Sequence, residues 1–132
     1  MTSWVWFSFK AGLMSSVLVV ENNRMIRTMY STGLTSFGYD VREAQGIREA
    51  TAQLDDGDVP SIVLLDLQLD DGLGLELISY IRQELGRPDV RIIVVTGMSI
   101  PHEDVIEYGA DMVLCKPIEL IELLNQIHAY SS

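Results

Sequence analysis

Four short apolar runs in this chain are each followed directly by polar residues that could do chemistry together. Glu21 and Asn22 follow the first run, Asp66 the second, Thr96 the third and Lys116 the fourth. Carboxylate and amide oxygens bind a hard cation such as Mg²⁺, a carboxylate can attack phosphorus, and hydroxyl and ammonium groups can hold phosphoryl oxygens. If the fold brings these side chains together, they form a site suited to phosphoryl transfer.

The apolar runs indicate how those side chains would be brought together. They cover residues 17–20, 62–65, 92–95 and 112–115, and they are apolar on both faces, as is typical of strands buried in a parallel sheet. A weaker strand is predicted over residues 39–43. Ligands of an open α/β sheet bind beyond the carboxyl ends of its strands, so we expect the residues after the runs to meet there.

The segments between the runs have apolar residues at every third or fourth position, which predicts helices. The first of these helices spans about residues 26–37 and can be capped by Asn22 or Asn23. Strict alternation of strands and helices predicts the α/β class, here a doubly wound five-stranded parallel sheet with five helices. We expect residues 15–130 to form this single domain.

Composition narrows the range of partners and compartments. The 132 residues are 48% hydrophobic, enough for one compact domain. The formal charge of −10 argues against direct binding to nucleic acid or to an anionic membrane, so a partner surface is expected to be basic or apolar. The single cysteine, Cys115, excludes an internal disulfide and multi-cysteine metal sites, which favours a cytoplasmic protein.

The first fourteen residues differ from the rest of the chain. Their cluster of Trp4, Val5, Trp6, Phe7 and Phe9 is too short to span a bilayer and lacks the basic start of a secretory signal. We interpret residues 1–14 as an apolar N-terminal extension that is disordered or was added artificially. An aromatic docking arm is the alternative.

Several other polar residues are assigned structural roles. We expect Cys115 to lie in the core because it ends an apolar run, and His102 and His128 to lie on helix surfaces without a ligand cluster. Asp70 and Asp71 lie beside Gly72 and are interpreted as a solvated turn.

Four motifs carry a resemblance to a known family. They are VLVVEN at the first run, IVLLDLQLDDGLGLELI around the second, VVTG at the third and GADMVLCKPI at the fourth. From residue 17 to about residue 127, the chain resembles the receiver domains of bacterial response regulators. The resemblance implies a flavodoxin-like (receiver) topology and a phosphoacceptor signalling switch of a two-component system. Such a domain is not an enzyme, although phosphoryl transfer to its own Asp66 would be partly self-catalysed.

The resemblance also implies roles for individual residues. Asp66 matches the phosphoacceptor, Thr96 the switch hydroxyl that bonds the acyl phosphate, and Lys116 the lysine that contacts the phosphoryl group. The peptide bond between Lys116 and Pro117 matches one that is typically cis in the family.

A Mg²⁺ site is implied at the same end of the sheet. Glu21 and Asn22 stand where the family usually has two acidic residues, Asp66 would be a further ligand, and Gln68 matches the position that offers its backbone carbonyl. Because Asn22 is neutral, Mg²⁺ affinity is expected to be weak. Capping of the following helix is an alternative role for Glu21 and Asn22.

Two further positions depart from the family pattern. Val113 occupies a position where many receivers have Tyr or Phe, whose rotation reports phosphorylation. Leu69 and Asp70 form a loop that often carries a proline. A valine cannot make the aromatic movement, so readout through the fourth helix, fifth strand and fifth helix would have to be driven differently.

Two other functions are compatible with parts of the sequence. Asn22 and Val113 suggest a pseudo-receiver, a protein-binding module that acts without phosphorylation, although Asp66, Thr96 and Lys116 are all present. An aspartyl-phosphate hydrolase of the haloacid dehalogenase kind would need a second Asp where Gln68 stands. Glutamine cannot transfer the required proton.

The resemblance implies a set of partners. Phosphoryl groups would come from a histidine kinase or a phosphotransfer protein. Output would pass to a downstream protein partner or to an output domain outside this chain. The charge of −10, and not the resemblance, is the reason to expect no direct contact with nucleic acid or membrane. A homodimer could form through the fourth helix, fifth strand and fifth helix, here about residues 100–109 and 118–129.

Overall fold

The computed structural model describes residues 15–131 and contains the predicted parallel sheet. Its five strands are β1 (Ser16–Val20), β2 (Asp40–Ala44), β3 (Ile62–Leu65), β6 (Arg91–Thr96) and β7 (Met112–Cys115). They are all parallel and lie in the order β2-β1-β3-β6-β7. The doubly wound α/β prediction is therefore confirmed, and the weaker strand lies within one residue of its predicted position.

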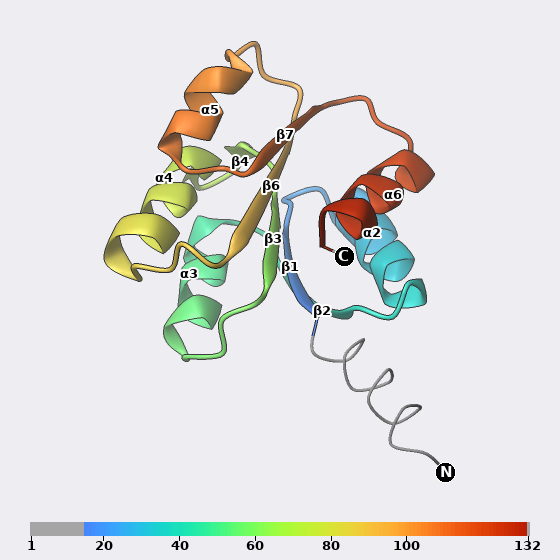
Figure 1. Ribbon diagram of the computed structural model, residues 1–132, viewed down its shortest axis with the longest axis horizontal. Helices are drawn as coiled ribbons and strands as arrows, with labels where there is room; N and C mark the ends of the chain where they lie inside the picture. Colours follow the sequence, from blue (N-terminus) through green and yellow to red (C-terminus); the bar gives the residue numbers. More distant parts are fainter. Residues whose placement is uncertain (1–14, 132) are drawn as a thin grey trace.

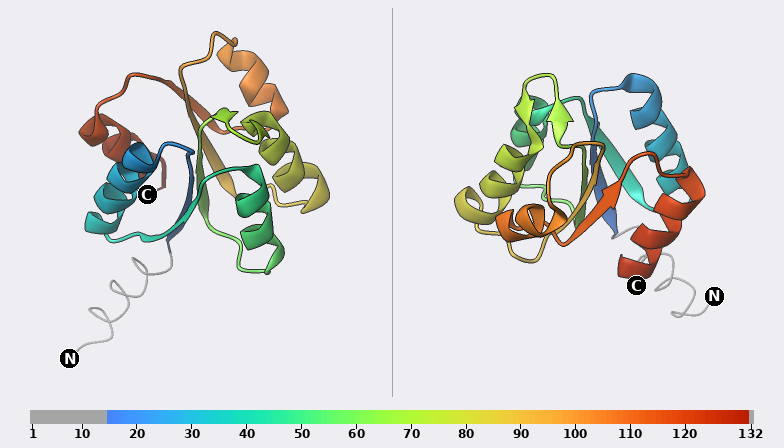
Figure 2. Two further views of the ribbon diagram at one scale, coloured as in Figure 1. Left: turned by 180° about the vertical axis from the view of Figure 1, so that it is seen from behind. Right: turned by 90° about the horizontal axis from the view of Figure 1, so that it is seen from above.

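Helices cover both faces of this sheet. They are α2 (Arg24–Ser36), α3 (Ile47–Asp55), α4 (Gly74–Ser79), which continues into the π-helical turn η1 (Tyr80–Glu84), α5 (His102–Tyr108) and α6 (Leu120–Ser131). Helices α3, α4 and α5 lie on one face, and α2 and α6 lie on the other (Figures 1 and 2). The five helical segments of residues 15–131 agree with the predicted number when α4 and η1 are counted together.

The core consists of two layers because neighbouring residues of a strand face opposite sides of the sheet. In β1, Leu18 and Val20 pack toward α3, α4 and α5, whereas Val17 and Val19 pack toward α2 and α6. All four side chains are at most 1% exposed. Strands β3 and β6 divide their residues in the same way, so β1, β3 and β6 form the buried centre of the sheet. The polar residues of interest lie at the carboxyl ends of these strands.

Strand β7 is less buried than the sequence pattern predicts. It is one of the two edge strands of the sheet, and Met112, Val113 and Leu114 are only half-buried. Cys115 is exposed, and its Sγ lies 3.2 Å from Nε2 of His102. The expectation that Cys115 belongs to the core is wrong, because an apolar run does not distinguish a central strand from an edge strand.

A small hairpin that the sequence did not predict follows β3. Strands β4 (Gln68–Leu69) and β5 (Gly72–Leu73) pair antiparallel, and Gly74 then begins α4. A Cβ at Gly74 would lie 2.7 Å from the backbone oxygen of Asp66, so the chain can pass this close only with glycine. The hairpin thus holds the segment after Asp66 against the end of the sheet.

The predicted extension over residues 1–14 lies outside the described residues. Within residues 15–131, no helix has the length and apolar character needed to cross a bilayer.

Candidate functional site

The register of the sheet determines which polar residues become neighbours. Val20 pairs with Leu65 in adjacent parallel strands, so the next residues, Glu21 and Asp66, lie side by side. The backbone N–H of Asp66 donates to the carbonyl of Val20 at 3.0 Å, which fixes this alignment.

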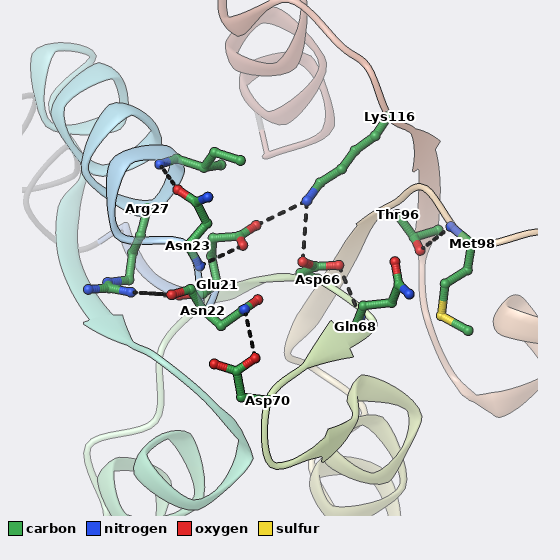
Figure 3. A network of polar contacts seen from close by, with 11 residues as sticks. Glu21, Asn22, Asn23, Arg27, Asp66, Gln68, Asp70, Thr96, Met98 and Lys116 are labelled. Atoms are coloured by element: carbon green, nitrogen blue, oxygen red, sulfur yellow. Dashed lines mark hydrogen bonds and ion pairs between the residues drawn. The ribbon is translucent and has the colours of Figure 1, made fainter.

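The register of β6 and β7 places Thr96 and Lys116 in the same way. Thr96 is in register with Cys115, and the backbone N–H of Lys116 donates to the carbonyl of Thr96 at 2.9 Å. The residues that follow the four apolar runs therefore gather at the carboxyl end of the sheet (Figure 3).

Lys116 joins two carboxylates that come from different strands. Its Nζ lies 3.2 Å from Oε1 of Glu21 and 3.2 Å from Oδ2 of Asp66. Glu21 is 2% exposed and Asp66 is 7% exposed, so two negative charges are held in a largely buried position. The peptide bond between Lys116 and Pro117 is cis, as the resemblance implies.

Burial and charge act against each other at this site. Burial raises the pKa of the Glu21 carboxyl, and the neighbouring charge of Asp66 adds to that rise, although the N–H of Asn23 and the ammonium of Lys116 oppose it. For Lys116, burial disfavours the charged form, but the carboxylates of Asp66 and Glu21 outweigh it and raise the lysine pKa. The lysine is therefore a firmly charged cation between two acids.

Glu21 also contacts the beginning of α2. Its Oε2 accepts a hydrogen bond from the backbone N–H of Asn23 at 3.0 Å. The guanidinium of Arg27 donates to the carbonyl of Glu21 at 2.8 Å, which fixes the backbone at this strand end. Glu21 thus has the helix-terminal role that the sequence left open, and it still lies against Lys116.

The cap of α2 is Asn23, because its side-chain oxygen accepts from the N–H of Ile26 at 3.0 Å. Asn22 is left for another contact. Its amide nitrogen donates to Oδ1 of Asp70 at 3.1 Å, so Asn22 reaches toward the β4–β5 hairpin (Figure 3).

Thr96 is placed at this end of the sheet with its hydroxyl directed at its own loop. The side chain is 2% exposed, and Oγ1 accepts from the backbone N–H of Met98 at 3.0 Å. Gln68 contacts Asp66 through its backbone, because its N–H donates to Oδ1 of Asp66 at 3.1 Å. The structure thus brings Glu21, Asp66 and Lys116 into direct contact, with Gln68 and Thr96 beside them.

The donor set at this end of the sheet fits a hard cation. Within residues 15–131, no three His, Cys, Asp or Glu side chains are grouped to hold a metal ion by themselves. The oxygens present are the carboxylates of Glu21 and Asp66, the amide oxygen of Asn22 and backbone carbonyls. Mg²⁺ takes oxygen ligands, usually one or two carboxylates, and keeps several waters, so these residues suit Mg²⁺ and would not suit a soft metal.

Asp70 and Asp71 form an exposed turn, as the sequence predicts, and both carboxylates also have specific partners. Asp70 accepts from Asn22, and Asp71 accepts from the backbone N–H groups of Ile47 and Arg48, at 2.9 and 3.0 Å. These N–H groups begin α3 and have no partner within that helix. The sequence offered only one indication that Asp70 is unusual, which is that it lies in a loop that often carries a proline in the family. No local sequence pattern connects Asp71 with a helix that begins 24 residues earlier.

This strand order, with a polar site at the carboxyl ends of its central strands, defines a flavodoxin-like doubly wound domain. The family model of the response regulator receiver domain matches residues 17–128. The chain belongs to this receiver domain family, whose members are signalling domains of two-component systems and generally bind Mg²⁺.

The curated proteins that this chain matches are regulators about twice as long as the matched region. The chain is 31% identical over 115 residues to the phosphate regulon transcriptional regulatory protein PhoB of Escherichia coli, covering 86% of this chain and 50% of PhoB. It is 33% identical over 122 residues to the response regulator ArlR of Staphylococcus haemolyticus, covering 88% of this chain and 52% of ArlR. The chain therefore spans about half the length of these relatives.

Solved structures agree on the fold. A CheY-like receiver domain protein from Methanospirillum hungatei has a TM-score of 0.80 at 27% identity, covering 89% of this chain and 93% of the other. The response regulator TrrA of Thermotoga maritima, solved in complex with Mg²⁺ and BeF, has a TM-score of 0.76 at 28% identity, covering 88% and 98%.

Proposed function

We propose that this domain is a phosphoacceptor switch in which Asp66 receives a phosphoryl group from a histidine kinase or a phosphotransfer protein. The observation that carries the proposal is the contact of Lys116 with Asp66, beside Glu21, at the carboxyl end of the sheet. A buried carboxylate with a cation at hydrogen-bonding distance is arranged for a group that brings additional negative charge.

The proposed step is a transfer between two side chains. An oxygen of Asp66 attacks phosphorus, the P–N bond of the donor phosphohistidine breaks, and its electron pair remains on the imidazole nitrogen. Lys116 would hydrogen-bond a phosphoryl oxygen. Thr96 accepts from Met98 and so keeps its own hydroxyl proton for donation to a second phosphoryl oxygen.

A bound Mg²⁺ would neutralise charge on the phosphoryl oxygens. Glu21, Asn22, Asp66 and the backbone carbonyl of Gln68 are the groups that would hold it. The proposed affinity is weak, because Asn22 offers a neutral oxygen where a second charged ligand would bind Mg²⁺ more tightly.

The switch would act through a local change of charge. The phosphoryl group carries a charge of about −1.5 to −2 at neutral pH and replaces the single charge of the Asp66 carboxylate, so the site gains about one negative charge at most. Movement of Thr96 toward this group would shift the loop between β6 and α5, and with it a pre-existing equilibrium between two conformations.

The test is the intact mass of the protein after incubation with Mg²⁺ and acetyl phosphate. Wild type is expected to gain one phosphoryl group, and Asp66→Ala is expected to gain none. Asp56→Asn, at the exposed C-terminal end of α3, is the matched control and should gain the group like wild type. Modification of Asp66→Ala to the wild-type extent would contradict the proposal.

A pseudo-receiver is the second candidate because Asn22 is neutral and bonded to Asp70. It would bind partners without phosphorylation. No mass gain in wild type at high Mg²⁺ and donor concentration would favour this function, and partner binding would then be unaffected by Asp66→Ala.

The proposed partner or homodimer surface is the face of α5, β7 and α6. Ile106 and Tyr108 on α5 and Ile121 on α6 are exposed apolar side chains, each more than two fifths accessible. Ile106→Glu and Ile121→Glu should weaken self-association measured by light scattering with acetyl phosphate, and should leave the mass gain intact.

We place the protein in the cytoplasm, which the free thiol of Cys115 supports.

A further inference from the structure

Two residues that are far apart in the chain meet at the edge of the acidic site. The amide nitrogen of Asn22, directly after β1, lies 3.1 Å from Oδ1 of Asp70, which is 48 residues away in the β4–β5 hairpin. Asn22 is half-buried and Asp70 is exposed. The contact joins two of the positions at which the sequence departs from the receiver pattern.

The chemistry of this contact fixes the orientation of the Asn22 amide. An ionised carboxylate is only an acceptor, so the NH₂ group of Asn22 must face Asp70. The amide oxygen is then on the opposite branch, and Figure 3 shows the amide between Asp70 and the Asp66 region. Without Asp70, the amide could rotate and present its NH₂ group, which cannot bind a cation.

Asp70 also brings a charge to the site. An acceptor that hydrogen-bonds the NH₂ group of an amide polarises it and increases the negative charge on its oxygen. The carboxylate of Asp70 therefore lies next to the NH₂ group of Asn22, the neutral ligand. The carboxylates of Glu21 and Asp66 are already neutralised in part by Lys116.

We propose that Asp70 is a positioning residue for divalent cation binding, which holds the Asn22 amide oxygen toward the site and supplies the negative charge that Asn22 lacks. This inference rests on the proposed function, because it assumes the Mg²⁺ site beside Asp66. Outer groups that orient metal ligands typically change metal affinity by about 10- to 100-fold when they are removed.

The first measurement is the Kd for Mg²⁺ of the unphosphorylated protein, by isothermal titration calorimetry, with Mn²⁺ as a second probe. Asp70→Ala removes both acceptor and charge and should raise Kd about tenfold. Asp70→Asn keeps an oxygen acceptor for Asn22 and should raise Kd by less. Asp56→Asn removes one exposed charge at the C-terminal end of α3 and should leave Kd unchanged.

A double variant distinguishes two roles of Asp70: positioning the Asn22 amide for cation binding, and only holding the β4–β5 hairpin against the end of β1. Asn22→Asp with Asp70→Asn moves the carboxylate to the ligand position and keeps a hydrogen-bonded pair, so its Kd should equal that of wild type or be lower. The side-chain NH₂ resonances of Asn22 should be well resolved in wild type and shift in Asp70→Ala. Thermal unfolding of each variant confirms that it is folded.

Each outcome decides between the two proposals. An unchanged Kd in Asp70→Ala, or equal increases in Asp70→Ala and Asp70→Asn, overturns the positioning role, while phosphorylation of Asp66 would stand. Absence of both Mg²⁺ binding and phosphorylation in wild type overturns both. A wild type that binds Mg²⁺ with the expected order of variants, and yet gains no phosphoryl group, supports the positioning role and contradicts the phosphoacceptor proposal.

Discussion

The ammonium of Lys116 lies 3.2 Å from Oδ2 of Asp66, although the two residues are 50 positions apart in the chain. The same ammonium lies 3.2 Å from Glu21, so one cation serves two buried carboxylates. Removal of the lysine would leave both negative charges close together without compensation. Loss of one partner of a buried ion pair is strongly destabilising for this reason.

Lys116→Met is therefore expected to destabilise the domain. Full burial of such a pair would predict a loss of about 3–5 kcal/mol, and the partial exposure of Lys116 reduces our expectation to about 2 kcal/mol. The measurement is the free energy of unfolding from urea titration at neutral pH. Glu21→Gln in the Lys116→Met background should recover part of the loss, because it removes one of the two uncompensated charges.

Arg87→Met is the matched control for Lys116→Met. Arg87 pairs with Asp89 on the surface, and exposed pairs contribute little to stability because water and salt screen them. Equal losses in Lys116→Met and Arg87→Met would show that the carboxylates of Glu21 and Asp66 do not depend on the lysine.

Thr96→Val should separate phosphorylation from the response to it. Valine has nearly the shape of threonine but cannot accept from Met98 or donate to a phosphoryl oxygen. We expect the mass gain with acetyl phosphate to remain, and the shifts of backbone amide resonances between β6 and α5 on phosphorylation to be lost. Thr96→Ser keeps the hydroxyl and should retain those shifts; their persistence in Thr96→Val would contradict the assigned role.

Gly74→Ala should be destabilising, and Gly97→Ala should be tolerated. A Cβ at Gly74 would lie 2.7 Å from the backbone oxygen of Asp66 and 2.9 Å from Cα of Leu67, and backbone atoms cannot move aside cheaply. Overpacking of this kind costs about 1–3 kcal/mol. At Gly97, the nearest atom would be Cβ of Lys116 at 3.8 Å, an ordinary contact. Urea unfolding of both variants gives the comparison, and a neutral Gly74→Ala would show that the hairpin can shift.

Much of this architecture could be predicted from short-range patterns. The apolar runs gave the central strands to within a residue, since burial on both faces requires continuous apolar residues. The position of Glu21, Asp66, Thr96 and Lys116 at strand ends then followed from parallel topology. The edge position of β7 and the exposure of Cys115 could not be predicted from the sequence, because they depend on the order of the strands in the sheet and not on the residues of β7.

The contacts of Asp70 and Asp71 show where prediction from sequence ended. Each carboxylate lies in an irregular hairpin and binds a partner at least 23 residues away, so no periodic pattern records the contact. A carboxylate next to a glycine looks the same in sequence whether it is solvated or holds a helix N-terminus. Only the folded arrangement distinguishes the two.

Asp71 makes the stability of α3 depend on pH. The N–H groups of Arg48 and Ile47 lower the pKa of its carboxyl below the ordinary value of 3.8. A carboxyl whose pKa is lower in the folded state stabilises the fold above its unfolded pKa, and this contribution is lost as pH falls through the folded pKa. Asp71→Ala should therefore cost about 1 kcal/mol at pH 7, as loss of a helix cap does. In urea titrations, the difference from wild type should shrink below about pH 4, whereas the Asp56→Asn control should stay near wild type throughout. A difference that is constant from neutral to acid pH would show that the ionised carboxylate is not what holds the beginning of α3.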